Sequence, residues 1–345
     1  MSTQARVLSV DDLHVSFTTE DGVVRAVDGV TFGLRSGEIL AIVGESGSGK
    51  SVTAQTIMGL TRSPNARISG RIDYGGRDLV AATEEDLMSI RGQEIAMIFQ
   101  DPMTSLNPVY RVGDQIVEAI RAHTDESKEQ AREKVVELLD AVGIPDPIQR
   151  AGNYPHEFSG GMRQRAMIAM GLALEPEVLI ADEPTTALDV TIQAQILRLL
   201  EQLNRDRDLA VIIITHDLGV VAEIADRVLV MYGGRIVEAG TLDQIFYDPQ
   251  HPYTWGLLGS LARPDRPRTM RLSQIKGQPP SLLAPPPGCH FRPRCPHAFD
   301  RCTAVPPLQA RVGDDHTDRC WLSVEQKKAL RVVSSGEIGL EAPAA

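Results

Sequence analysis

The sequence lacks cysteine throughout its first 288 residues, and its aliphatic runs, such as Ala210–Ile214, are far too short to cross a bilayer. Its first ten residues contain no apolar core of signal-peptide length, so nothing in them directs export. It also has no run of Lys and Arg, and its net charge of −11 argues against nucleic acid as a main partner. We therefore expect a protein whose role at a membrane, if it has one, is peripheral.

The bulk composition is that of a soluble globular protein, with 42% hydrophobic and 23% charged residues. A chain of 345 residues is long enough for one large domain and a smaller one. All four cysteines lie between Cys289 and Cys320. In a reducing cytoplasm such clustering favours metal binding over disulfides.

A glycine-rich stretch, Gly44–Ser51, fits the pattern G-x-x-x-x-G-K-[ST] between an apolar run and a segment that can be a helix, residues 52–60. Glycines let successive backbone N–H groups point at an anion, and a helix N-terminus adds further donors. Lys50 would reach the β- and γ-phosphates, and the Ser51 hydroxyl would hold Mg²⁺. We predict that ATP is bound by Gly44, Ser46, Gly47, Ser48, Gly49, Lys50, Ser51 and Thr53.

Polar side chains follow three predicted strands, residues 94–99, 178–182 and 209–215. Asp182 would hold the Mg²⁺ shell, and Glu183 would orient and deprotonate the attacking water. Gln100 can present its amide oxygen to Mg²⁺ or to this water, and His216 can reach the γ-phosphate. We therefore predict Glu183, His216 and Gln100 as the catalytic residues.

The remaining segments complete an α/β pattern. Strands at residues 8–17 and 30–34 predict an antiparallel β layer, where Phe17 either stacks on the nucleotide base or is a half-buried strand aromatic. Residues 112–173 have helical periodicity. Within them, Ser159 is a good N-cap, and Gly160 and Gly161 expose backbone donors to an anion.

Taken together, these motifs resemble the ATP-binding subunit of an ABC transporter. The resemblance covers about residues 7–262 and rests on six ordered motifs: Gly44–Ser51, Gln100, Ser159–Met162, Val178–Glu183, Thr186–Asp189 and His216. It implies a P-loop NTPase with an antiparallel β layer, a parallel core sheet and a helical subdomain at about residues 101–176. It also implies that ATP lies between the phosphate loop of one subunit and the Ser-Gly-Gly stretch of a partner, with Asp189 nearby.

One motif departs from the family's pattern. The family's usual Leu-Ser-Gly-Gly-Gln is Phe-Ser-Gly-Gly-Met here, so we assign Met162 no ligand contact.

The sequence also bears on competing functions. A soluble ABC ATPase of translation or DNA repair would have two ATPase halves or a long coiled-coil insertion, and a GTP-dependent switch would have Asn-Lys-x-Asp; the sequence has none of these. A transport ATPase is therefore the favoured function.

A narrower resemblance, to the dipeptide and oligopeptide branch of bacterial importers, which includes nickel importers, rests on Asp101–Pro108, Phe158–Arg165 and His251–Thr254. It implies a second, different ATPase subunit, two membrane permeases and an extracytoplasmic binding protein. It places the chain at the cytoplasmic face of the inner membrane. The cargo would be a peptide, with nickel or another solute as the alternative.

The C-terminal part, residues 263–345, is predicted to be a Pro-rich extension carrying the cysteines. Four thiolates can enclose Zn²⁺ or an iron–sulfur cluster, and the wide spacing, without a C-x₂₋₄-C pair, suits the larger group. The branch resemblance implies a [4Fe–4S] cluster, while zinc and a metal-free state stay open. The predicted ligands are Cys289, Cys295, Cys302 and Cys320.

Overall fold

The computed structural model describes residues 6–101, 105–186, 188–260, 275–310 and 315–335. Part of the predicted peptide-branch motif, residues 102–104, and residue 187 of the stretch from Thr186 to Asp189 lie outside these residues. So do the first residues of the predicted extension, 263–274.

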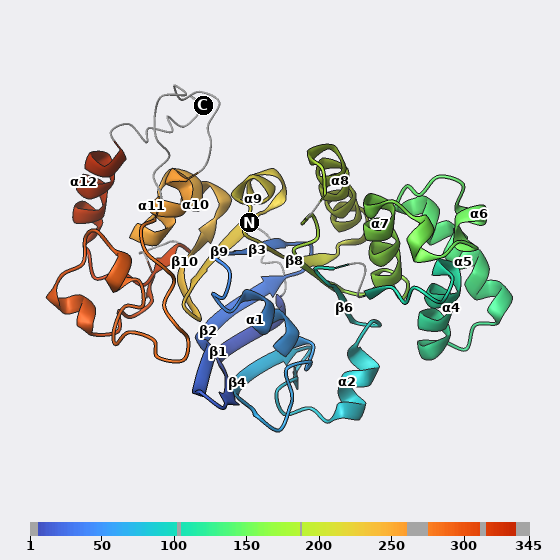
Figure 1. The fold of residues 1–345 in the computed structure, drawn as a ribbon, viewed down its shortest axis with the longest axis horizontal. Coiled ribbons are helices and arrows are strands. Elements are labelled where there is room, and N and C mark those ends of the chain that lie inside the picture. Colours follow the sequence, from blue (N-terminus) through green and yellow to red (C-terminus); the bar gives the residue numbers. More distant parts are fainter. Residues whose placement is uncertain (1–5, 102–104, 187, 261–274, 311–314, 336–345) are drawn as a thin grey trace.

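Two sheets form the centre of the molecule (Figure 1). The first has the strand order β2-β1-β4-β5 and is antiparallel, as the sequence predicts. Its strands are β1 Arg6–Thr19, β2 Gly22–Arg35, β4 Ala66–Tyr74 and β5 Arg77–Asp78. The second has the order β11-β12-β10-β9-β3-β8-β7-β6.

Five neighbouring strands of the second sheet are parallel, which confirms the predicted parallel core. They are β9 Arg227–Tyr232, β3 Ile39–Val43, β8 Ala210–Thr215, β7 Val178–Asp182 and β6 Ile95–Ile98. The sheet then continues with antiparallel strands β10 Arg235–Thr241, β12 Thr317–Asp318 and β11 Gln309–Ala310. Because β12 pairs with β10, the C-terminal region extends this sheet.

Helices surround these sheets at both ends of the molecule (Figure 1). The helices at one end match the predicted helical segment: α4 Val112–His123, α5 Lys128–Ala141, α6 Pro147–Ala151 and α7 Gly160–Gly171. Those near the sheets are α1 Lys50–Ile57, α2 Glu84–Ile90, α8 Val190–Arg207 and α9 Leu218–Ile224. The C-terminal side has α10 Leu242–Tyr247, α11 Pro252–Gly259 and α12 Val324–Ser335.

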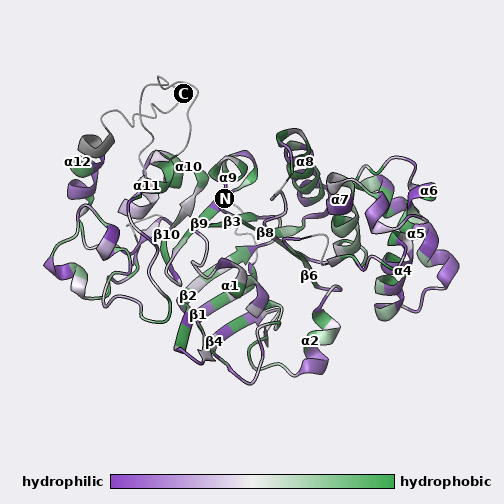
Figure 2. Ribbon diagram, viewed as in Figure 1, coloured by the Kyte–Doolittle hydropathy of each residue, from purple (hydrophilic) through white to green (hydrophobic). Residues whose placement is uncertain are grey.

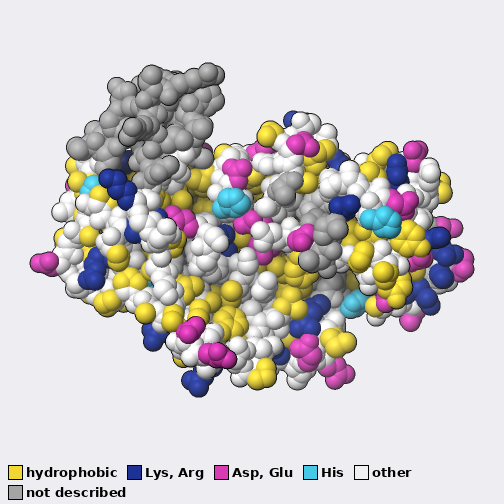
Figure 3. All heavy atoms as spheres, viewed as in Figure 1, with side chains coloured by type: hydrophobic (Ala, Val, Ile, Leu, Met, Phe, Trp, Pro, Cys, Tyr) yellow, Lys and Arg dark blue, Asp and Glu magenta, His cyan; other side chains and the backbone are white. Residues whose placement is uncertain are grey.

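The central parallel strands are hydrophobic along their length because helices and the antiparallel sheet cover both of their faces (Figure 2). Every residue of β3, β7 and β8 is buried. The burial of these strands fixes where their carboxyl ends lie, and those ends carry the predicted catalytic residues. On the face shown in Figure 3, acidic and basic side chains are interspersed.

Candidate nucleotide-binding and catalytic site

The phosphate loop joins β3 to α1 and contains two glycines that no other residue could replace without a clash. A Cβ atom on Gly44 would lie 2.2 Å from the Met231 carbonyl oxygen. One on Gly49, whose φ is +100°, would lie 2.4 Å from the Ala26 carbonyl oxygen. The Lys50 ammonium donates to the Gly44 and Glu45 carbonyl oxygens, at 2.7 and 3.1 Å, and so lies within the loop.

The loop fits a bound phosphate group. Ser48 is only 4% exposed, and its hydroxyl oxygen has no hydrogen-bond partner among the described residues. The loop opens onto a cavity of about 720 Å³, which is large enough for a nucleotide. Burial lowers the pKa of Lys50, while the carboxylates of Glu183, Asp182 and Glu45 oppose that shift. An anion bound in the loop would therefore contact an ammonium group that is already shielded from solvent.

Two predicted Mg²⁺ ligands lie side by side at the start of α1 and the end of β7. The Ser51 hydroxyl donates to Asp182 Oδ1 at 3.1 Å. Burial raises the pKa of Asp182, and the hydrogen bond from Ser51 opposes this. A divalent cation between the two oxygens would favour the ionised carboxylate, so both groups fit Mg²⁺.

The Glu183 carboxylate accepts hydrogen bonds from three neighbouring side chains. Gln100 donates its amide N–H to Oε2 at 2.9 Å, Thr186 donates its hydroxyl to the same oxygen at 2.8 Å, and His216 Nδ1 lies 3.1 Å from Oε1. Although burial acts against ionisation, the bonds from Thr186 and His216 lower the pKa of Glu183. The structure thus places two predicted catalytic residues, Gln100 and His216, against the carboxylate of the third, Glu183.

The predicted Ser-Gly-Gly stretch, Ser159–Gly161, which we call the signature stretch, does not line the loop cavity. Ser159 caps α7 by accepting from the Met162 N–H at 3.3 Å, and Asp189 caps α8 by accepting from the Ile192 N–H at 2.9 Å. A Cβ on Gly161 would lie 2.7 Å from the Ile192 side chain, so the starts of these helices pack together. Neither Ser159–Gly161 nor Asp189 is among the described residues that line the loop cavity.

Two further residues that are predicted to contact the nucleotide, Phe17 and Thr53, do not line the loop cavity among the described residues. Phe17 is half-buried, packs against the core between the sheets and is not among the described residues that line the cavity. Thr53 is fully buried, and its hydroxyl donates to the Gly49 carbonyl oxygen at 2.9 Å. Thr53 therefore supports the loop, and base stacking on Phe17 stays a prediction.

The C-terminal region contributes residues to the loop that the sequence alone did not reveal. The Glu45 N–H donates to the Tyr253 hydroxyl oxygen at 2.9 Å, and the Glu45 carboxylate pairs with Arg294. Leu257, Ser260 and Ile275 line the cavity. The His251–Thr254 stretch was the available signal for Tyr253, whereas the local sequence around Arg294 gives none.

The four predicted cluster ligands line one small cavity of about 20 Å³, room for about one water molecule. All four are free thiols, and burial raises the pKa of Cys295 and Cys320 to about 12. In the part of the chain that the structure describes, no group of three or more His, Cys, Asp or Glu side chains is arranged to hold a metal ion. The four thiols thus share one cavity without the arrangement of a metal site, and the iron–sulfur or zinc centre stays a prediction.

Comparison with known families gives two matches. The model of the ABC transporter family matches residues 27–186, and that of the oligopeptide/dipeptide transporter C-terminal region matches residues 237–302. A relative named dipeptide transport ATP-binding protein DppD, from Bacillus subtilis, is 56% identical over 96% of this chain and 98% of its own length. This chain belongs to the ABC transporter family. It is an ATP-binding subunit whose activity is ATP hydrolysis coupled to transport.

Other ABC proteins support the same assignment. The oligopeptide transport ATP-binding protein OppD of Salmonella typhimurium is 55% identical over 93% of this chain and 95% of its own. The solved dimeric cassette MJ0796, described as bacterial, has a TM-score of 0.62 at 26% identity and covers 68% of this ABC chain and 98% of its own. No helix in the described residues is both long and apolar enough to span a membrane.

Proposed function

We propose that this chain is one ATPase subunit of an importer for dipeptides or oligopeptides. The observation that carries the proposal is the similarity to dipeptide and oligopeptide transport proteins over nearly the whole chain, which includes the oligopeptide/dipeptide C-terminal region at residues 237–302. An importer for nickel or another solute is the alternative. A soluble, non-transport ABC ATPase would lack membrane partners altogether.

We assign the chemistry of ATP hydrolysis to the residues around the loop cavity. Gly44–Ser51 binds the phosphates through its backbone N–H groups and Lys50, and Ser51, Asp182 and Gln100 hold Mg²⁺. Mg²⁺ held by these residues would supply the positive charge that balances charge developing on the phosphate oxygens. Glu183 orients a water molecule and accepts its proton, while His216 holds the carboxylate through Oε1.

We propose that ATP is enclosed only when a second ATPase subunit, a different chain, joins this one. Ser159–Gly161 does not share a cavity with the chain's own loop among the described residues. Its exposed Ser159 and Gly160 and its helix N-terminus suit the phosphates bound by the partner, and Asp189 lies beside it at the start of α8. The two chains would form two such sites.

In this account the ATPase domain spans residues 1–262, with its helical subdomain at about 101–176, and residues 263–345 form the C-terminal extension. The ATPase pair lies beneath two transmembrane permeases at the cytoplasmic face of the inner membrane. An extracytoplasmic binding protein delivers the peptide, and nucleic acid has no part. The net charge of −11 agrees with this last point.

Reconstitution tests the transport function. The chain is purified with the products of neighbouring genes and placed in proteoliposomes with ATP on the side of the ATPase subunits. We expect ATP-dependent uptake of a labelled tripeptide and no uptake of Ni²⁺. Uptake of Ni²⁺ alone would overturn the peptide cargo, and failure of any permease to co-purify would overturn the importer.

We also propose that the four-cysteine cavity holds a metal centre, a [4Fe–4S] cluster in preference to zinc. The support is that all four thiols line one cavity in spite of their wide spacing in the chain. The cavity would have to expand to admit a cluster. Anaerobic purification with metal analysis tests this: iron and a brown colour are expected, whereas a colourless protein with one zinc or no metal would overturn the cluster.

A further inference from the structure

Arg294, in the cysteine-bearing part of the C-terminal region, reaches the phosphate loop and makes a bidentate ion pair with Glu45. Its Nη1 donates to Oε2 at 2.6 Å and its Nη2 to Oε1 at 3.1 Å. The arginine side chain is 6% exposed and the glutamate side chain 25%. A fork of this kind fixes both the position and the charge of the carboxylate.

The guanidinium is held in place by the rest of its surroundings. It donates to the Tyr232 hydroxyl at 3.2 Å and to the carbonyl oxygens of Lys276 and Ile275 at 3.0 and 3.3 Å. Its central carbon also lies 5.7 Å from the centre of the Tyr232 ring. Arg294 is thus a fixed positive group rather than a mobile surface side chain.

The segment that carries Arg294 is itself anchored to the ATPase sheet. His290 Nδ1 lies 2.7 Å from the Gly233 carbonyl oxygen, and the next residue, Gly234, donates its N–H to the Ser48 carbonyl oxygen of the loop at 3.0 Å. The Phe291 ring packs against the rings of Tyr232 and Tyr253, with centres 5.2 and 5.4 Å away. The loop, the β9–β10 turn and the extension therefore form one packed unit.

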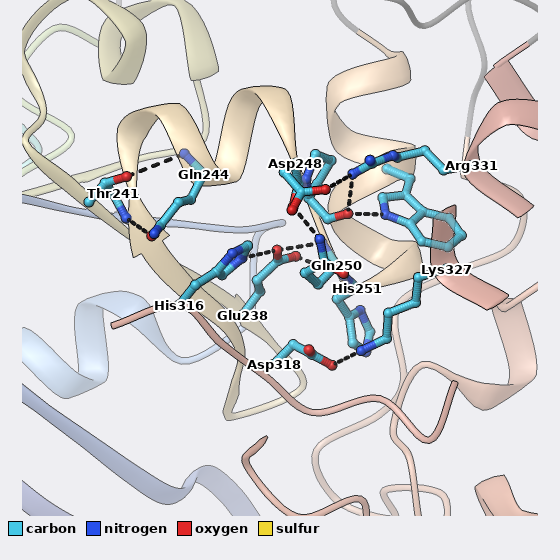
Figure 4. Close-up of polar contacts among 12 residues, drawn as sticks. Glu238, Thr241, Gln244, Asp248, Gln250, His251, His316, Asp318, Lys327 and Arg331 are labelled. Carbon is cyan, nitrogen blue, oxygen red and sulfur yellow. Dashed lines mark hydrogen bonds and ion pairs between the residues drawn. The ribbon is translucent and has the colours of Figure 1, made fainter. Parts of the chain in front are cut away.

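A second group of contacts joins the extension to the sheet farther along β10 (Figure 4). Buried Glu238 accepts from the N–H groups of Gln250 and His251 at 2.6 and 2.8 Å, and its Oε1 lies 2.8 Å from His316 Nε2. Lys327 and Asp318 make a buried ion pair at 2.6 Å. These contacts keep the C-terminal region seated where Arg294 can reach the loop.

Glu45 presents an electrostatic problem to a loop that binds a triphosphate. Its backbone lies between Gly44 and the phosphate-binding N–H groups, and its carboxylate is close enough to influence Lys50. An unpaired carboxylate there would repel the anion, because like charges in a partly buried site are weakly screened. We propose that Arg294 is a positioning residue for nucleotide binding, which neutralises Glu45 and orients the phosphate loop.

Four variants of the full chain test this role: Arg294→Met, Glu45→Gln, the double variant, and Arg301→Met as a matched control. Arg301 belongs to the same region but is exposed and stacks on Trp321, 3.9 Å from its ring centre. Calorimetry measures binding of Mg·ATP at low and high salt, and the assembled complex gives kcat and KM for ATP.

We expect Arg294→Met to weaken Mg·ATP binding and raise KM on the order of tenfold, with kcat at saturating ATP little changed. Added salt should shrink the defect, and Glu45→Gln in the same chain should restore most of the affinity. The control variant should match the wild type. Wild-type affinity in Arg294→Met, or a double variant as weak as Arg294→Met, would overturn the proposal.

If thermal unfolding shows that Arg294→Met is poorly folded, Arg294→Lys is measured in its place, because lysine keeps the positive charge. We expect near-wild-type affinity for Mg·ATP in Arg294→Lys. A tenfold loss of affinity would overturn the neutralising role. The inference rests on the proposed nucleotide site, so Lys50→Ala is measured alongside. Undiminished Mg·ATP binding in Lys50→Ala would refute the site itself. Loss of binding there with wild-type affinity in Arg294→Met would refute only the role of Arg294.

Discussion

At the scale of single residues, the position of Glu183 is the most informative feature of the site. Its φ of +48° puts a residue with a side chain in the left-handed region, at a cost of about 1–3 kcal/mol. Glu183 directly follows β7, and its carboxylate accepts hydrogen bonds from Gln100, Thr186 and His216. Such strain is typical of residues that a protein holds in place for chemistry.

Replacing Glu183 by Gln removes the general base and leaves the shape of the site in place. We expect ATP turnover by the assembled complex to fall about 10²- to 10⁴-fold while ATP binding persists. Steady-state phosphate release and calorimetric ATP binding measure the two quantities. Turnover near that of the wild type would remove Glu183 from the role of base.

Replacing Gly49 by Ala tests the backbone of the loop. The added Cβ would collide with the Ala26 carbonyl oxygen, so we expect a loss of about 2 kcal/mol or more in the free energy of unfolding. Gly47→Ala is the matched control, since Gly47 also has positive φ but has open space within 4 Å of the added atom. Equal urea midpoints for the two variants would contradict the close approach at Gly49.

At the scale of elements, the sequence predicted the strands and helices that carry the nucleotide motifs. Their apolar runs are short, continuous and followed by polar residues, so β3, β7 and β8 and the residues at their ends were all recognisable. The pairing of β12 with β10 was not predictable in this way. Strands of two residues carry no periodicity, and they form only because the rest of the sheet is present.

The same reasoning explains which site residues were missed. Arg294 and Glu45 are 249 positions apart, and each is an ordinary charged residue within its own local sequence. Tyr253 lies in a recognisable motif, but nothing in that motif tells that its hydroxyl accepts a hydrogen bond from the phosphate loop. Contacts of this kind depend on the docking of the C-terminal region, which local patterns do not encode.

The start of α11 provides a pH-dependent test of that docking. His251 is buried, and its Nδ1 accepts from the Tyr253 N–H at 3.1 Å. Burial and the nearby charge of Lys327 lower the pKa of His251 to about 3. The unfolded chain takes up this proton near its usual pKa of 6.5, so the free energy of unfolding should fall as the pH drops from about 6.5 towards 3.

His251→Asn keeps an acceptor for the Tyr253 N–H and removes the titrating group. Between pH 7 and pH 5 we expect the variant to lose about 2 kcal/mol less stability than the wild type. Urea unfolding at each pH measures this difference. The exposed His123, replaced by Gln, is the control and should follow the wild type. Parallel curves for His251→Asn and the wild type would show that His251 does not stay neutral when buried.

At the scale of the whole molecule, the two elements that we propose to contact nucleotide lie apart. The phosphate loop is at the centre, where β3 meets α1, while the signature stretch begins α7 on the side of the helical subdomain, and the C-terminal region lies at the opposite end (Figure 1). In the proposed pair of ATPase subunits, a single chain therefore provides one incomplete half of each of two sites. We expect it to bind nucleotide alone and to hydrolyse it poorly.

The most direct test is ATP turnover measured for the chain alone and again after assembly with its partner ATPase, permeases and binding protein, with and without peptide. The account predicts slow turnover by the isolated chain and faster turnover by the assembled complex, raised further by peptide. Equal turnover by the isolated chain and the complex, or an assembled complex indifferent to peptide, would contradict it.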